Sequence, residues 1–172
     1  YIKAGFASAI DSVHINDSGI INVIDVARNE LTSISSNGET ISQGYNYSNI
    51  AVGEDGTLLR FGKNYNVQLM SKDQRSLWVR NYLFTKVCFW GQDRIAGLSG
   101  GVLYILDKET GNTLFQLSAV LDCGLGQTTK GNLVLLSGDA KILEINRDYD
   151  ITIRSSISTL AGNVIGFGVS AD

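Results

Sequence analysis

The sequence predicts an all-β protein assembled from about four copies of one antiparallel unit. Each copy is a segment in which short apolar runs alternate with turns rich in Gly, Asn, Asp and Ser. The clearest turns fall at 17–19, 54–56, 99–101 and 137–139. Successive turns are about 37, 45 and 38 residues apart, a spacing typical of propeller blades or solenoid units.

Several of the runs are apolar at consecutive positions, as at 20–24, 102–106 and 133–136. A strand that buries one face would alternate, so these strands are expected to be covered on both faces. No ten-residue stretch has a helical apolar stripe that could provide the cover. Stacked four-stranded sheets provide it instead, which predicts a β-propeller or propeller segment of about four antiparallel blades. A β-helix usually has shorter coils, and a sandwich would not explain why the copies match.

We expect one propeller-like domain over residues 1–172, with units at approximately 10–46, 47–90, 91–128 and 129–160. Residues 163–172 repeat the start of a further unit, which indicates a piece of a longer protein or a chain completed by a neighbour. Each unit has three clear strands, and the predicted fourth strands are 40–45, 77–84 (or on to Trp90) and 120–128.

The segment 102–115 resembles the blade motif of quinoprotein-type propellers, which are similar in scaffold to WD40-like blades. Asp107, Thr110 and Gly111 match that motif, and Phe115 stands where the family has the tryptophan that docks neighbouring blades. The resemblance implies a propeller scaffold. Nothing that resembles the cofactor site of that family is present in the sequence, so no cofactor is predicted.

Composition narrows the classes of partner. The net charge is -3 with scattered Lys and Arg, which argues against nucleic acid and anionic membrane as partners. No apolar run is long enough for a membrane span. The two cysteines, Cys88 and Cys123, occupy matched places in neighbouring units, farther apart than a disulfide allows, so we expect free thiols. This favours a cytoplasmic or virion-associated protein over a secreted, disulfide-bonded one.

The candidate catalytic and metal-binding residues have simpler explanations. His14, the only histidine, is expected within a strand, and its structural role is favoured over catalysis. Asp148 and Asp150 lack the ligand pattern of a calcium loop and are expected to accept hydrogen bonds from their own turn. The glycines of 97–101 and 124–126 precede strands rather than helices, so they predict hairpins and bulges rather than phosphate loops. Gly56 and Gly101 are expected at positive φ.

The strongest candidate for a contact surface is the run 75–82, where Arg75, Trp78, Arg80 and Tyr82 combine the residue types enriched in interface hot spots. We therefore predict a non-enzymatic interaction or structural module, with other protein subunits or the remainder of a longer chain as partners. A viral tail or adhesion apparatus is one such setting. A propeller that binds a carbohydrate or another ligand is the alternative, and a quinoprotein-like or glycosidase-like enzyme is the third reading.

Overall fold

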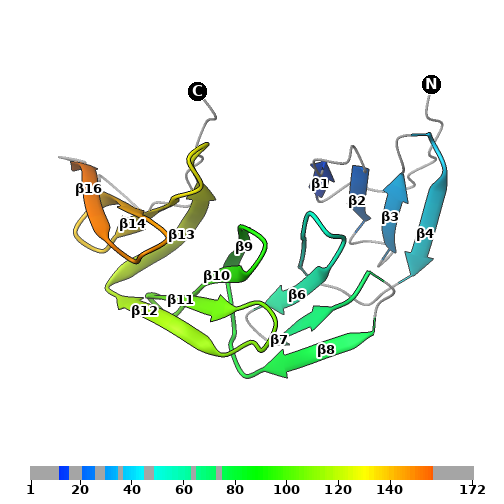
Figure 1. Cartoon of the computed structure of the whole chain (residues 1–172), viewed down its shortest axis with the longest axis horizontal. Helices are drawn as coiled ribbons and strands as arrows, with labels where there is room; N and C mark the ends of the chain where they lie inside the picture. Colours follow the sequence, from blue (N-terminus) through cyan, green and yellow to red (C-terminus); the bar gives the residue numbers. More distant parts are fainter. Residues whose placement is uncertain are drawn as a thin grey trace. The chain divides into compact units, whose positions relative to one another are not determined.

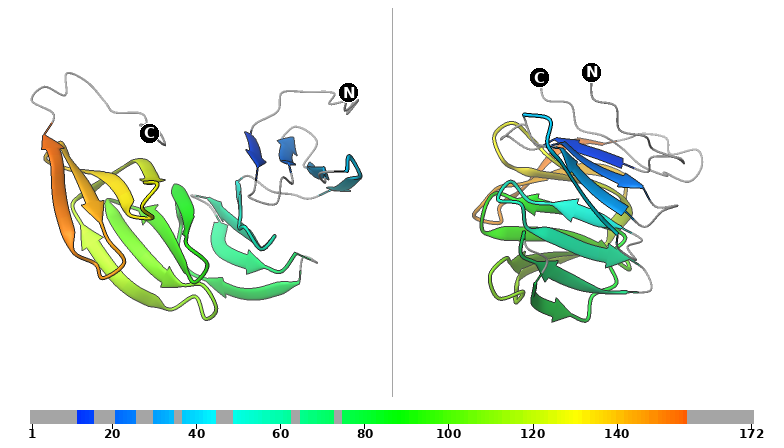
Figure 2. Two further views of the ribbon diagram at one scale, coloured as in Figure 1. Left: turned by 45° about the horizontal axis from the view of Figure 1, so that its top comes forward. Right: turned by 90° about the vertical axis from the view of Figure 1, so that its right-hand side faces the viewer.

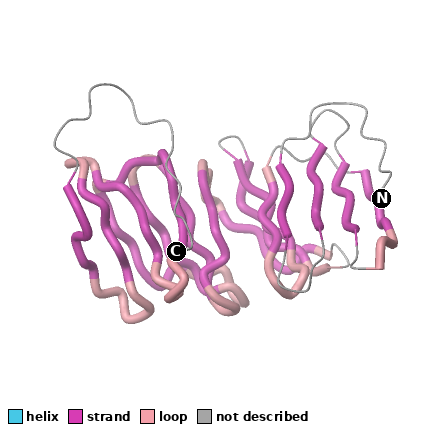
Figure 3. Tube along the Cα trace, turned by 90° about the horizontal axis from the view of Figure 1, so that it is seen from above, coloured by secondary structure: helices cyan, strands magenta, loops and turns pink. Residues whose placement is uncertain are grey.

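The computed structural model describes residues 12–15, 21–25, 30–34, 37–44, 49–62, 65–72 and 75–156. All the regular secondary structure in these ranges is β-strand, and they contain no helix (Figure 3). Consequently, no helix among them is long and apolar enough to cross a membrane. The all-β prediction is confirmed.

The strands form four sheets of four, each an antiparallel meander in chain order (Figure 1). The first sheet contains β1 (Ser12–Ile15), β2 (Ile21–Asp25), β3 (Glu30–Ile34) and β4 (Thr40–Gly44), and the second contains β5 (Ile50–Val52), β6 (Leu58–Gly62), β7 (Tyr65–Met70) and β8 (Ser76–Arg80). The third contains β9 (Lys86–Trp90), β10 (Arg94–Ser99), β11 (Val102–Asp107) and β12 (Thr113–Ser118), and the fourth contains β13 (Val120–Gln127), β14 (Leu133–Ser137), β15 (Lys141–Ile145) and β16 (Ile151–Ser156). Four repeated four-stranded sheets are the architecture that the sequence predicted.

Two of the predicted strand assignments need correction. The segment 120–128 was expected to close the third unit, but β13 pairs with β14 and opens the fourth sheet. Residues 86–90 likewise do not extend the second unit, because β9 pairs with β10 in the third sheet. The reason is local: β13 contains two glycines and a register shift, so its side-chain pattern did not indicate which neighbour it joins.

The chain forms two compact units, Tyr1–Phe61 with Gln68–Leu77, and Gly62–Val67 with Trp78–Asp172. In the first, Ile50, Leu58 and Met70 form a small buried cluster. The second contains the main core, a buried cluster of residues from the third and fourth sheets; the ribbons of these two sheets lie side by side in Figure 2. Every residue of β14 is buried, as its unbroken apolar run predicted.

The turns confirm the predicted glycine chemistry. Gly56 has φ 80°, and the pair Gly100 and Gly101 have φ 58° and 78° in the two-residue turn between β10 and β11. Two successive positive φ values are the requirement of a type I′ hairpin turn. The glycines of 124–126 lie in β13, beside its register shift, which confirms the bulge interpretation.

Candidate interaction site

The candidate site is built on residues 75–84, which contain β8 and the four residues that follow it; the N–H of Tyr82 donates to the carbonyl of Arg80 at 2.9 Å, so the chain bends there. From Leu77 to Phe84, more exposed and more buried side chains alternate along the chain. Trp78 and Phe84 are 7% and 0% exposed, whereas Leu77, Val79 and Leu83 are 54%, 47% and 45% exposed. The segment therefore has an inward side that is mostly aromatic and an outward side that is mostly aliphatic.

Trp78 is held by the turn that joins β11 and β12. Its indole Nε1 donates a hydrogen bond to the carbonyl of Lys108 at 2.8 Å. Its ring lies against Gly111, where a Cβ atom would be 2.8 Å from the indole. Gly111 has φ 70°, so this position requires glycine both for its backbone conformation and for the space that the indole occupies.

Arg80 and Tyr82 extend the same contact along the segment. The Arg80 guanidinium lies 5.9 Å from the centre of the Trp78 ring and donates to the carbonyl of Thr110. The hydroxyl groups of Tyr82 and Thr113 are 2.5 Å apart. We call this set the Trp78 contact: Trp78, Arg80 and Tyr82 against residues 107–113.

The turn that receives the Trp78 ring is formed by the quinoprotein-like motif residues Asp107, Thr110 and Gly111. The Asp107 carboxylate accepts hydrogen bonds from the backbone N–H and the hydroxyl of Thr110, each at 2.7 Å. These bonds lower the pKa of Asp107. The N–H of Gly111 donates to the Asp107 carbonyl at 2.8 Å and closes the turn. The Asp-x-x-Thr-Gly sequence thus fixes the turn in which Gly111 contacts the indole of Trp78.

The four residues predicted to contact a partner therefore occupy different places. Arg75 is exposed, and its N–H donates to the Ser71 hydroxyl at 3.1 Å. Trp78, Arg80 and Tyr82 all contact the turn within the chain. Contact with a partner through 75–82 stays a prediction. The outward aliphatic residues were not singled out, because 77–79 and 82–84 are consecutive apolar residues and the sequence does not distinguish their two sides.

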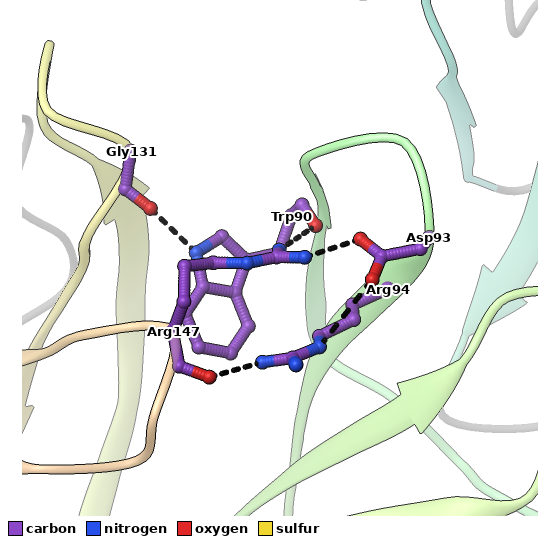
Figure 4. Close-up of polar contacts among 5 residues, drawn as sticks. All are labelled: Trp90, Asp93, Arg94, Gly131 and Arg147. Carbon is purple, nitrogen blue, oxygen red and sulfur yellow. Dashed lines mark hydrogen bonds and ion pairs between the residues drawn. The ribbon is translucent and has the colours of Figure 1, made fainter.

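A second aromatic contact joins the third and fourth sheets (Figure 4). The indole Nε1 of Trp90 donates to the carbonyl of Gly131 at 2.6 Å. Two guanidinium groups lie near the Trp90 ring, with that of Arg147 4.8 Å and that of Arg94 5.2 Å from its centre. Arg147 also donates to the Trp90 carbonyl, and Arg94 to the Arg147 carbonyl, both at 2.6 Å.

Asp93 completes this set by pairing with Arg147. Partial burial tends to raise the pKa of Asp93, but the hydrogen bond and positive charge of Arg147 outweigh it, so the pKa is lowered. We call this set the Trp90 contact: Trp90, Asp93 and Arg94 with Gly131 and Arg147. It differs from the Trp78 contact in containing an ion pair.

Phe115, which stands in place of the docking tryptophan of the family motif, contacts the next sheet. Its ring stacks on Tyr149, in the turn between β15 and β16, with centroids 4.9 Å apart and planes 7° from parallel. Phenylalanine here does what tryptophan does in the family motif, joining one sheet to the next.

The other candidate residues show no catalytic arrangement in the part of the chain that the structure describes. His14 lies in β1 opposite Asn22, which confirms its strand position. Cys88 is a free thiol that packs against the main core, and burial raises its pKa to about 12. It is therefore protonated near neutral pH and unsuited to nucleophilic chemistry. The side chain of Cys123 lies outside the description.

The acidic turn after β15 is organised by an asparagine. Asn146 Oδ1 accepts the backbone N–H groups of Asp148 and Asp150, each at 2.9 Å. The turn is closed by local hydrogen bonds, but the acceptor of its backbone N–H groups is Asn146 rather than the two aspartates, and the Asp150 carboxylate accepts from the Asn146 side-chain amide at 3.0 Å. No group of three or more His, Cys, Asp or Glu side chains suited to a metal ion occurs among the described residues.

Comparison with solved structures identifies the fold. Virginiamycin B lyase from Staphylococcus aureus matches with a TM-score of 0.59 and 14% identity, covering 86% of this chain and 55% of that one. The WD40 β-propeller domain of Doa1 matches at 0.63 and 13% identity, covering 91% and 56%. Kluyveromyces lactis Hsv2 matches at 0.61 and 13% identity, covering 92% and 48%.

These likenesses show that the chain has the fold of part of a β-propeller. The chain spans about half the length of the solved propellers that it matches. No protein-family model matches the sequence, and no curated protein is similar to it. The matched structures include both an enzyme and WD40 domains, so the fold alone does not assign an activity.

Proposed function

We propose that the protein is a non-enzymatic interaction module that binds a protein partner through the outward side of residues 75–83. The observation that carries this proposal is the exposure of three aliphatic side chains, Leu77, Val79 and Leu83, within seven residues of chain. Aliphatic side chains gathered on an exposed surface are typical of protein contact sites. The Trp78 contact on the inward side holds the segment in place, so that the outward side is presented by a rigid support.

The cationic side chain of Arg75 adds polar contact at the edge of this surface, and it is exposed. Of the four residues first predicted to contact a partner, Arg75 keeps that role in the proposal. Trp78, Arg80 and Tyr82 become supporting residues, because they contact residues 107–113. The setting in a larger protein or a multi-subunit particle belongs to the same proposal.

Selection of binding peptides from a displayed random library tests it. The wild-type protein is expected to enrich a peptide family that the Val79→Asp, Leu83→Asp double variant no longer binds. Leu114→Asp is the matched control, because Leu114 is also an exposed aliphatic residue, on β12, and its variant should retain binding. Equal enrichment by the double variant would place the contact surface elsewhere. Binding on a glycan array, without peptide enrichment, would favour the carbohydrate-binding alternative.

A further inference from the structure

The connection between β3 and β4 contains the one Asn-Gly pair of the sequence, Asn37 and Gly38. Residues 37–39 are all exposed, and the pair Ile34 and Thr40 closes the hairpin around them. Gly38 has φ 84°, and a Cβ atom added there would meet nothing within 4 Å. The backbone around Gly38 is therefore uncrowded and open to solvent.

The side chain of Asn37 is folded back over this backbone. Its Oδ1 accepts the backbone N–H of Glu39 at 3.2 Å, which is the hydrogen bond of an Asx turn. This bond keeps the side-chain amide beside the Gly38 peptide, whose nitrogen has no Cβ next to it to restrict approach. An N–H donor on a carbonyl oxygen also stabilises the negative charge that develops there when the carbonyl carbon is attacked.

We propose that Asn37 is a modification site at which the chain deamidates itself. Hydroxide removes the proton of the Gly38 amide, and the Gly38 nitrogen attacks Cγ of Asn37. The new N–Cγ bond closes a five-membered succinimide ring, the Cγ–Nδ2 bond breaks, and the nitrogen leaves as ammonia with a proton from water. Water then opens the ring at Cγ, which gives aspartate, or at the backbone carbonyl, which gives isoaspartate.

Asn146 provides a comparison within the same chain. Its Oδ1 likewise accepts the backbone N–H of the residue two positions on, Asp148, at 2.9 Å. The residue that follows it is Arg147, whose Cβ crowds the amide nitrogen that would have to attack. Asn146 thus has the Asx turn without the glycine, and it should keep its amide.

Both products alter the hairpin between β3 and β4. Either one adds a negative charge beside Glu39 and changes the net charge of the chain from -3 to -4, since one charge is added. Isoaspartate also adds a methylene group to the main chain between Ile34 and Thr40, the residues that close the hairpin. The affected strand, β4, is the last strand of the first sheet and pairs only with β3 among the described strands.

The test incubates the 172-residue chain in native buffer at neutral and mildly alkaline pH. The wild type is expected to accumulate a form with one additional negative charge, separable by ion exchange, and faster at the higher pH. Peptide mapping should find both aspartate and isoaspartate at position 37 and intact amide at Asn146. Asn37→Gln should lose this form, because its longer side chain would have to close a six-membered ring. Gly38→Asn should lose conversion at position 37, since asparagine tolerates the positive φ but adds a Cβ beside the nucleophile.

Four results would each overturn the proposal. The first is a native wild type that gains no acidic form, or gains it only when unfolded in urea, because the folded turn would then protect the amide. The second is conversion at position 37 in Gly38→Asn as fast as in the wild type. The third is equal conversion of Asn146, which would show that glycine is not required. The fourth is aspartate without isoaspartate, which would indicate direct hydrolysis in place of ring closure.

Discussion

The Trp78 contact and the Trp90 contact each join one sheet to the next, but they do so by different interactions. In both, an indole N–H donates to a backbone carbonyl of a turn in the following sheet, and an arginine lies near the indole. The Trp78 contact depends on shape, because its ring fits the space that Gly111 leaves open. The Trp90 contact depends more on charge, because two guanidinium groups and a carboxylate surround the ring. The two should therefore respond differently to volume, salt and pH.

The largest effect is expected from Trp78→Ala. Removing a buried tryptophan leaves a cavity and should lower the free energy of unfolding by about 3–5 kcal/mol. Trp78→Phe retains most of the ring but leaves the Lys108 carbonyl without the indole donor, and should cost about 1–2 kcal/mol. Urea denaturation of both variants measures the difference. Equal losses for the two would show that the hydrogen bond, rather than the shape, dominates the Trp78 contact.

A pair of glycine substitutions compares the turn that contacts Trp78 with the turn that contacts Trp90. Gly111→Ala meets both a positive φ and the indole, so about 2–4 kcal/mol of stability should be lost. Gly131→Ala also meets a positive φ of 78°, but its nearest neighbour, the Gln127 amide, is 3.6 Å away. Its cost should be about 1–2 kcal/mol, from the backbone alone. A cost at Gly131 as large as that at Gly111 would contradict the view that only the Trp78 contact depends on close fit.

Much of this architecture could be predicted from the sequence, for identifiable reasons. The repeat and the turn glycines are local signals, and they predicted the four sheets and the φ values of Gly56 and Gly101. The assignment of β13 to the fourth sheet depends on tertiary pairing, because its own pattern is interrupted by a bulge. The residue types at 75–82 indicated an important surface, but composition could not show that Trp78 docks onto a turn 30 residues farther along the chain.

The Trp90 contact was not predicted, and its chemistry explains why. Asp93 and Arg147 are paired although they are 54 positions apart in the sequence. Such a pair becomes visible only when the sheets are stacked. By contrast, the resemblance motif marked the position of Phe115, because the family has its docking tryptophan there, although the sequence did not predict that phenylalanine would make the contact.

Arginine substitutions measure how much each contact depends on charge. Arg147→Met removes a hydrogen bond to the Trp90 carbonyl, the pair with Asp93 and a cation–π contact, and should cost about 1–3 kcal/mol. Arg80→Met in the Trp78 contact loses one backbone hydrogen bond and a more distant cation–π contact, and should cost about 0.5–1.5 kcal/mol. Thermal or urea unfolding of the two variants gives the comparison. A larger loss at Arg80 would reverse the assignment of charge dependence to the Trp90 contact.

The smallest expected effect is a difference in the response to acid and salt. The pKa values of Asp93 and Asp107 are both lowered in the folded protein, so each carboxylate stabilises the fold above its ordinary pKa, and that contribution is lost as the pH falls through the lower folded value. Partial burial opposes the shift of Asp93, whose pKa is lowered by the hydrogen bond and then by the positive charge of Arg147, whereas hydrogen bonds from uncharged Thr110 lower the pKa of Asp107. Salt screens the first interaction more than the second. Asp93→Asn should therefore destabilise the protein less at high salt than at low salt, while the cost of Asp107→Asn stays nearly constant.

Both variants should show a shallower loss of stability on acidification than the wild type. Urea titrations at two salt concentrations and several pH values would measure this, and the same salt dependence for both variants would remove the electrostatic distinction between the two contacts.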